Sequence, residues 1–181
     1  MAVGDFNGDG NFDIVAASGF GVSALLGSGD GTLQAPLAYP LNFETFNIAV
    51  GDFNEDGKPD AAVTSFYLDE VEILLGNGEG SFETGASYPA SGASTALAMA
   101  VADFNRDGHP DLAITTRNSV DVYLGNGDGT FGPGVNVAAG VPALFLAVGD
   151  FNNDGWPDLA VANQGDSSVS ILTNTTAAPK P

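Results

Sequence analysis

A nine-residue pattern that occurs four times is the feature of this chain that most restricts its fold. The pattern is Asp-Phe-Asn-x-Asp-Gly-x-x-Asp, and its copies begin at Asp5, Asp52, Asp103 and Asp150. The copies are therefore 47, 51 and 47 residues apart in a chain of 181 residues. Self-similarity at a spacing of roughly 20–50 residues is typical of a repeat protein, in which similar units stack on one another.

Each copy of the pattern places oxygen-bearing side chains at its first, third, fifth and ninth positions, with glycine at the sixth. Alternate side chains of a tight loop can point inward together, and glycine permits the sharp turn because it tolerates positive φ. Calcium, a hard cation, takes about six to eight oxygen ligands. We therefore predict one calcium site in each copy, about four in the chain. In the first copy the ligands would be Asp5, Asn7, Asp9, the backbone carbonyl of Asn11, and Asp13.

The loop is similar to the first half of an EF-hand loop, but an EF-hand needs Glu at position 12. Apolar residues occupy that position here, namely Ala16, Val63, Ile114 and Val161. The ninth-position Asp must then supply the final carboxylate, and the β-favouring residues after it indicate that the loop joins two strands. The alternative is an Asx-rich β-turn that needs no metal. Against it, three carboxylates that face one another repel strongly without a cation.

The chain is strongly acidic, with a formal net charge of −19 from 23 acidic residues. Twelve of these acids are Asp at the predicted ligand positions, and four calcium ions would add eight positive charges and bring the net charge to −11. We expect no binding to nucleic acids or to anionic membranes by charge. The sequence contains no apolar run of about 18 residues, so we also expect no membrane insertion.

The expected calcium sites also bear on location. Calcium loops of extracellular modules bind at about 10⁻⁴–10⁻³ M, so they fill outside the cell and stay largely empty in the cytosol. Calcium usage therefore favours a secreted or cell-surface protein. No signal peptide is visible, because Met1 falls directly on the first expected strand.

A second motif, Leu-Gly-Asn-Gly-Asp-Gly-Thr-Phe in its clearest form, recurs out of phase with the first. It occupies Leu26–Leu33, Leu75–Phe82 and Leu124–Phe131. Asn-Gly between apolar segments indicates a β-hairpin, because both turn residues tolerate positive φ. The glycine spacing does not match a dinucleotide-binding fingerprint, so we interpret the motif as structural rather than as a ligand loop.

Each repeat divides into four short strands, which in the third repeat are expected at 98–104, 112–116, 120–125 and 131–138. Four strands in about 47–51 residues are typical of a β-propeller blade. The apolar segments Ile48–Val50 and Leu146–Val148 are expected to be inner strands buried on both sides. A phenylalanine beside the first ligand of each copy is expected to plug a blade interface: Phe6, Phe53, Phe104 and Phe151.

The metal loop followed by an apolar strand resembles the FG-GAP repeat family, also catalogued among VCBS-type repeats, which builds the propellers of integrin α-subunits. The resemblance extends from Met1 to about Thr173 and implies calcium in the loop between strands 1 and 2 of a blade. By position it implies three further ligand sets. These are Asp52, Asn54, Asp56 and Asp60 with the carbonyl of Lys58, then Asp103, Asn105, Asp107 and Asp111 with that of His109, and Asp150, Asn152, Asp154 and Asp158 with that of Trp156.

The predicted fold is therefore an all-β propeller of four-stranded antiparallel blades. We place four FG-GAP-like blades at about 1–46, 47–97, 98–144 and 145–174, the last without its outer strand, and a flexible tail at 175–181. The resemblance implies six to eight blades in a closed ring. The chain could be half of a propeller that dimerises to about eight blades, an unusual four-bladed ring, or a fragment of a longer array. We favour the homo-oligomer, a dimer that completes the ring.

The function that we expect is a non-catalytic, calcium-stabilised module for adhesion or ligand recognition, with a protein or a carbohydrate as ligand. The loops between strands 2 and 3 and between blades differ among the repeats, and function tends to lie on variable loops over a rigid scaffold. They include Phe43–Phe46, Phe66–Asp69, Ser91–Thr95, Arg117–Asn118 and Gln164–Ser168, where Phe46 and Tyr67 could stack on a sugar ring or meet a protein.

Two other functions remain open. One is a structural propeller fragment, excised or designed, that self-assembles and has no ligand of its own. The other is a propeller-based lyase or hydrolase, for which the sequence offers little. The chain has a single histidine, His109, inside a metal loop, and it lacks the Gly-x-Ser-x-Gly elbow of the α/β-hydrolases. We therefore expect no enzymatic activity.

Overall fold

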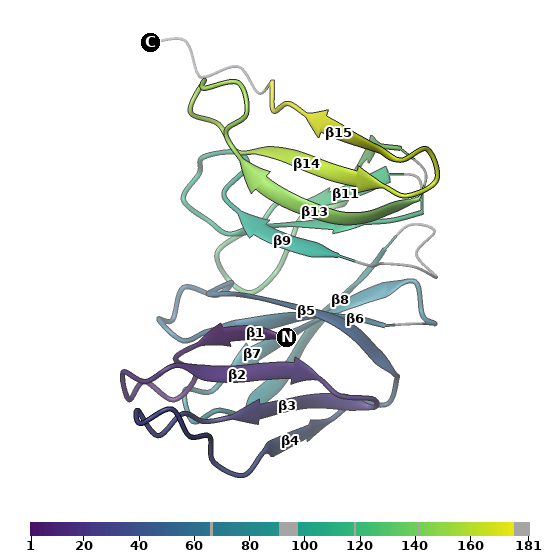
Figure 1. The fold of residues 1–181 in the computed structure, drawn as a ribbon. Coiled ribbons are helices and arrows are strands. Elements are labelled where there is room, and N and C mark those ends of the chain that lie inside the picture. The colour runs from purple at the N-terminus through teal and green to yellow at the C-terminus, as the bar shows by residue number, and fades with distance from the viewer. Residues whose placement is uncertain (66, 91–97, 118, 141, 176–181) are drawn as a thin grey trace.

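The computed structural model describes residues 1–65, 67–90, 98–117, 119–140 and 142–175, and within them it contains fifteen β-strands and no helix. The strands form four separate antiparallel sheets (Figure 1). Each sheet is a meander in which consecutive strands are hydrogen-bonded neighbours, as expected for a propeller blade. The prediction of an all-β propeller with four repeats is confirmed. None of the described residues forms a helix long and apolar enough to cross a bilayer.

The first three blades have four strands, and the fourth has three in the described part of the chain. The first blade comprises β1 (Ala2–Gly4), β2 (Asp13–Ala17), β3 (Gly21–Leu25) and β4 (Leu37–Pro40). The second comprises β5 (Thr45–Gly51), β6 (Asp60–Ser65), β7 (Glu70–Gly76) and β8 (Phe82–Pro89). The third comprises β9 (Met99–Ala102), β10 (Asp111–Thr115), β11 (Ser119–Tyr123) and β12 (Val135–Ala138). The fourth comprises β13 (Ala143–Gly149), β14 (Asp158–Asn163) and β15 (Ser168–Leu172).

The blades lie face to face in chain order. Strands of the first blade contact β5, β5 contacts β9, and β9 and β10 contact β13. The first and fourth blades lie at opposite ends of the row in Figure 1. The described residues therefore form four consecutive propeller blades in an open row, with one face of each end blade turned outward.

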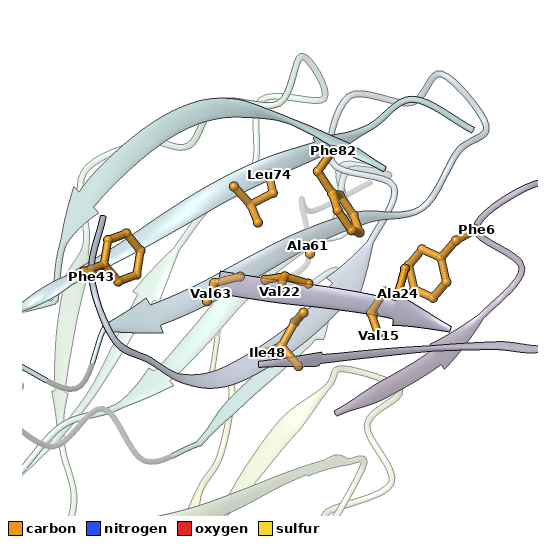
Figure 2. Packing of buried hydrophobic residues seen from close by; sticks show 10 residues of the cluster. All are labelled: Phe6, Val15, Val22, Ala24, Phe43, Ile48, Ala61, Val63, Leu74 and Phe82. Atoms are coloured by element: carbon orange, nitrogen blue, oxygen red, sulfur yellow. The ribbon is translucent and has the colours of Figure 1, made fainter. Parts of the chain in front are cut away.

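The core is divided into three apolar clusters, one at each blade interface. Figure 2 shows the first, in which Phe6 and Val15 of the first blade pack with Val63, Leu74 and Phe82 of the second. Apolar burial of this kind contributes about 25 cal/mol per Å², so each interface stabilises the two blades on either side of it. A blade thus depends on its neighbours for stability, as in other repeat proteins.

Three of the four expected plugs occupy these interfaces. Phe6, Phe53 and Phe104 are buried in the first, second and third clusters. The prediction is wrong for Phe151, which is 48% exposed. Each plug packs against the following blade, and among the described residues no blade follows the fourth.

The expectation that the inner segments are buried on both sides is also wrong. Ile48 is buried, but Ala49 and Val50 are only partly so, and Leu146–Val148 is largely exposed. The fully buried strands are instead the second strands of the two middle blades, since every residue of β6 and β10 is buried. An inner strand has a hydrogen-bonded neighbour on one side only and faces the centre of the propeller, whereas the second strand lies between two others.

Some expectations lie outside the described residues. They concern Phe66, Ser91–Thr95, Asn118 and all but the first residue of the tail expected at 175–181.

Candidate metal centre

All four copies of the nine-residue pattern form the loop between the first and second strands of a blade. The first copy joins β1 to β2, and the others join β5 to β6, β9 to β10 and β13 to β14. The loops of successive blades therefore lie on the same side of the propeller. The sequence placed them correctly because a run of β-favouring residues follows each ninth-position Asp.

In the first loop, the side chains at positions 1, 3 and 5 fold back onto the loop's own backbone. One carboxylate oxygen of Asp5 accepts hydrogen bonds from the N–H of Gly8 (2.8 Å) and Asp9 (3.1 Å), and the other accepts one from Gly10 (2.9 Å). The amide oxygen of Asn7 accepts from the same Asp9 N–H (3.1 Å), and Asp9 accepts from the N–H of Asn11 (2.8 Å). Oxygens of Asp5 and Asn7 thus approach one point, the N–H of Asp9.

The other three loops repeat this arrangement. Their fifth residues donate a backbone N–H to both the first and the third side chain, at 2.9–3.1 Å, in the loops that begin at Asp52, Asp103 and Asp150. The glycine at position 6 has a φ of 81° to 95° in all four loops, so it adopts the left-handed conformation that its lack of Cβ permits. One backbone conformation therefore presents the same oxygen atoms four times.

Position 4 of the loop is left-handed as well. Gly8 occupies it in the first loop, but Glu55, Arg106 and Asn153 take φ values of 57° or 58° in the others. Non-glycine residues seldom adopt this conformation. The loop geometry thus comes from the network of Asp and Asn hydrogen bonds and overrides the local preference of the residue at position 4.

The ninth-position Asp has a structural role that the sequence did not indicate. Asp13 is fully buried, and its two oxygens accept hydrogen bonds from the N–H of Phe6 (2.8 Å) and of Gly27 (2.7 Å). Gly27 lies beyond the third strand, so this carboxylate fastens the metal loop to the hairpin that follows. Equivalent bonds of 2.7–2.9 Å connect Asp60 with Phe53 and Gly76, Asp111 with Phe104 and Gly125, and Asp158 with Phe151 and Asn174.

The glycines that donate this hydrogen bond to the ninth-position Asp belong to the second motif, which we predicted to be structural. A Cβ atom on Gly76 would lie 2.1 Å from the carbonyl oxygen of Pro59, and one on Gly125 would lie 2.2 Å from that of Pro110. The Leu-Gly pair at the end of the third strand, or directly after it, was the available sequence signal for this close approach. The hairpin that follows closes as predicted, although its glycines, such as Gly78 and Gly80, have positive φ and Asn77 does not.

The carboxylates of the loop differ in their titration. The pKa of Asp9 is lowered mainly by the hydrogen bond from the backbone N–H of Asn11, and that of Asp107 by the bond from His109. Burial raises the pKa of Asp60 and Asp111 in spite of the backbone hydrogen bonds that they accept. The exposed carboxylates of Asp9 and Asp107 are therefore well suited to remain ionised at neutral pH.

Oxygen is the donor in every predicted ligand set, which fits a hard cation. Among the described residues, no three His, Cys, Asp or Glu side chains are grouped so that they alone could hold a metal ion. The third position is an amide, and the ninth carboxylate is engaged by two backbone N–H groups. A cation in these loops would thus depend on the first and fifth carboxylates together with amide and carbonyl oxygens.

Successive loops also contact one another, through position 4 of one and position 7 of the next. Glu55 of the second loop hydrogen-bonds His109 of the third, and this bond is the largest contribution raising the pKa of His109. Arg106 of the third loop stacks over the ring of Trp156 in the fourth, 4.4 Å from its centre. The side chains of these seventh-position residues therefore link blades, while their carbonyl groups are the predicted ligands.

Phe46 and Tyr67 are both exposed, as a ligand-contacting role requires. Phe46 lies at the start of β5 rather than on the expected loop, while Tyr67 lies between β6 and β7. Phe43 is instead buried in the first interface cluster, so this aromatic residue of the Phe43–Phe46 loop belongs to the core.

The FG-GAP-like repeat family matches residues 5–63, 52–114 and 103–161, most of the chain. The protein therefore belongs to this family. A comparison with curated proteins found no match.

Solved structures with the same fold have low sequence identity. One is an Agrocybe aegerita lectin, in a structure described as specific recognition of non-reducing terminal N-acetylglucosamine, with a TM-score of 0.60 and 22% identity over 96% of this chain and 51% of that one. Another is BBS1N in complex with ARL6DN, with a TM-score of 0.64 and 14% identity over 95% and 52%. A third is the Photorhabdus luminescens Tc holotoxin pore, with a TM-score of 0.58 and 22% identity over 95% and 9%. The chain thus spans about half the length of the first two.

Proposed function

We propose that this FG-GAP-like propeller is a non-catalytic module that binds about four calcium ions and recognises a protein or carbohydrate ligand. The observation that supports calcium most directly is the fourfold repetition of one loop conformation with the same oxygen donors. Asx-rich turns without metal do occur. They give no reason, however, for the same oxygen donors to recur at the same positions in all four loops.

In the first loop, Asp5, Asn7 and Asp9 with the carbonyl of Asn11 would hold the ion. Asp13 can contribute as well, because each carboxylate oxygen has two lone pairs and can accept a backbone N–H while it binds a cation. The same assignment applies at each equivalent position in the other three loops. Calcium would neutralise the first- and fifth-position carboxylates of each loop and so rigidify the side of the propeller on which the loops lie.

Isothermal titration of the chelator-treated protein with calcium tests this proposal. We expect about four ions per chain. Asp107→Ala should remove one site and leave about three, while Asp128→Ala, an equally exposed acid in the neighbouring hairpin, should leave four. Absence of calcium uptake at millimolar concentrations would overturn the proposal, because extracellular calcium modules bind within about 10⁻⁴–10⁻³ M.

For the ligand, we place recognition on the variable loops opposite the metal loops. Phe46 and Tyr67 offer exposed aromatic rings there, and rings of this kind contribute to binding hot spots. The similarity to a lectin structure makes carbohydrates the first class to test. Calcium-loaded protein should bind members of a glycan array, and the Phe46→Ala and Tyr67→Ala variants should lose that binding. Unchanged glycan binding in both variants would show that the ligand site lies elsewhere.

A second candidate function is self-assembly, which the outward faces of the end blades support. Val22, Val71 and Val120 occupy equivalent positions and are buried by the next blade, whereas their counterpart Val169 is 64% exposed. At the other end, Leu33 is 44% exposed while its counterparts Phe82 and Phe131 are buried. The two end faces thus have the residue types of the two sides of an internal interface.

We propose that a second copy covers both faces and forms a dimer of about eight blades. Native mass spectrometry of the calcium-loaded chain should then give a dimer with about eight ions, and Val169→Asp should give a monomer with about four. A wild-type monomer at tens of micromolar would contradict the dimer and leave the calcium proposal intact. A calcium affinity in the range of extracellular modules fits a secreted or surface protein. The acidity of the chain fits a protein that binds no nucleic acid.

A further inference from the structure

A groove of about 510 Å³ runs between the third and fourth blades at the outer edge of the propeller. Its lining is mainly apolar and includes Phe104, Val122, Val137, Leu159 and Leu172. No charged side chain lines it among the described residues. The first two blade interfaces indicate what occupies such a place.

At those interfaces the space is filled by an aromatic residue that follows the turn of the outer hairpin of the following blade, Phe82 at the start of β8 and Phe131 just before β12. Phe82 packs edge-on against Phe6, with ring centres 6.1 Å apart, and against Tyr39 at 6.3 Å. Phe131 packs in the same way against Phe53 at 5.4 Å and Tyr88 at 5.7 Å. Such contacts contribute about 0.5–1.5 kcal/mol beyond apolar burial.

The third interface has the receiving residues of this arrangement but not the inserted one. Phe104 corresponds to Phe6 and Phe53, and Val137 stands where Tyr39 and Tyr88 stand in the first two blades. The aromatic residue itself would come from an outer strand of the fourth blade. The described part of that blade ends with β15 as the edge strand of a three-stranded sheet.

The backbone contacts follow the same rule. The N–H of Gly80 donates to the carbonyl of Phe6 at 3.0 Å, and that of Gly129 donates to the carbonyl of Phe53 at 2.8 Å, so each outer hairpin is fastened to the preceding blade. At the third interface the carbonyl of Phe104 accepts instead from the side-chain amide of Asn174, at 2.6 Å.

The third blade also has the apolar side chains that would pack against the turn of such an outer hairpin. At the first interface Gly80 lies against the side chains of Leu26 and Leu37. Their counterparts in the third blade are Leu124 and Val135, which line the groove and are 38% and 57% exposed. The groove thus has the size, the apolar lining and the position of a site for an outer strand with its turn.

We propose that this groove binds an extended peptide segment from another molecule that has the outer-strand sequence of this repeat, Gly-acidic-Gly-Ser/Thr-Phe. The segment adds to β15 as an antiparallel strand, and its phenylalanine inserts against Phe104 and Val137. Main-chain hydrogen bonds to an edge strand supply affinity in such β-augmentation, and the side-chain pocket supplies specificity. The proposal is independent of calcium and of the glycan site.

A synthetic peptide with the sequence of Asn77–Pro89, which includes this turn and β8, provides the test. Fluorescence anisotropy with the labelled peptide should show saturable binding to the full chain. A peptide with the Phe82→Ala change should bind at least about tenfold more weakly, because truncation of a buried aromatic anchor removes most of its contribution. The measurements need about 0.15 M salt, which screens the repulsion between an acidic peptide and an acidic protein.

Two protein variants locate the site. Val135→Arg, at an exposed position of the groove, should weaken binding, while Phe20→Arg, at a similarly exposed apolar position in the first blade, should leave it unchanged. Hydrogen exchange should slow at the amides of β15 when the peptide is bound. Equal affinity of the two peptides, no binding up to about 1 mM, or unchanged exchange in β15 would each overturn the proposal.

Discussion

Replacement of Asp111 by alanine should destabilise the protein whether or not calcium is present. Asp111 is fully buried, and its oxygens accept hydrogen bonds from the N–H of Phe104 (2.7 Å) and Gly125 (2.8 Å). Alanine leaves both N–H groups without these acceptors, at a cost of about 1–3 kcal/mol each. Burial raises the pKa of this carboxylate, so its removal also relieves some desolvation. We therefore expect the free energy of unfolding to fall by about 2–4 kcal/mol.

Asp107→Ala is the matched control from the same loop. Asp107 is exposed, and the N–H of His109 that it accepts can bond to water instead. In EDTA the change should alter the free energy of unfolding by no more than about 0.5 kcal/mol, as is usual for surface substitutions. With calcium at ten times its Kd, loss of one site should cost about 1.4 kcal/mol. The two carboxylates are thus separated by their dependence on calcium.

Urea denaturation in excess EDTA and in excess calcium measures both variants. The single tryptophan, Trp156, is buried, so its fluorescence reports unfolding directly. A loss below about 1 kcal/mol for Asp111→Ala in EDTA would refute the fastening role, because two hydrogen bonds to a buried carboxylate cannot be so weak. An equal loss for Asp107→Ala in both conditions would show that its effect does not depend on calcium.

The remaining predictions concern calcium, one pKa and one glycine. EDTA should lower the melting temperature strongly, since four sites at ten times Kd contribute roughly 5–6 kcal/mol; an unchanged melting curve would count against structural calcium. Glu55→Gln in EDTA should lower the pKa of His109 measured by NMR, because the bond to Glu55 is the main cause that raises it. A raised folded pKa adds stability below the ordinary value of about 6.5 that is lost as the pH rises through the folded value, so acidification should favour the wild type over the variant. Gly76→Ala should cost about 1–3 kcal/mol through overpacking, since its Cβ would lie 2.1 Å from a carbonyl oxygen, whereas Gly132→Ala, with its nearest atom at 3.7 Å, should be nearly neutral; similar losses for the two would contradict the clash.

The repeat made the fold predictable. A single short apolar segment does not identify a strand, but the same segment at the same position in several copies does. In the third repeat the expected strand at 112–116 corresponds to β10 (Asp111–Thr115), and the one at 120–125 corresponds to β11 (Ser119–Tyr123). The outer strand was expected to begin at Phe131, but β12 begins at Val135. Phe131 forms only an isolated bridge with Gly125, because it turns into the interface as the aromatic plug of the hairpin.

The direction of a side chain was less predictable than its chemistry. The pattern shows that Asp13 is an oxygen donor at a fixed position, but not that Phe6 and Gly27 present N–H groups to both of its oxygens. That contact depends on the third strand returning beside the loop, which no property of the nine residues specifies. The glycine after the third strand was the only trace of it in the sequence.

Equivalence between repeats also has a physical limit, which the end blades expose. Phe151 matches Phe104 in sequence, yet one is half exposed and the other buried, because burial of a plug is a property of the following blade. The same reasoning applies to the groove beside Phe104, where the receiving side chains are present and the inserted aromatic is not. A repeat motif therefore predicts what a blade offers to its neighbour. Whether those side chains become buried depends on the adjoining blade, and the exposed interface residues of the fourth blade follow from this.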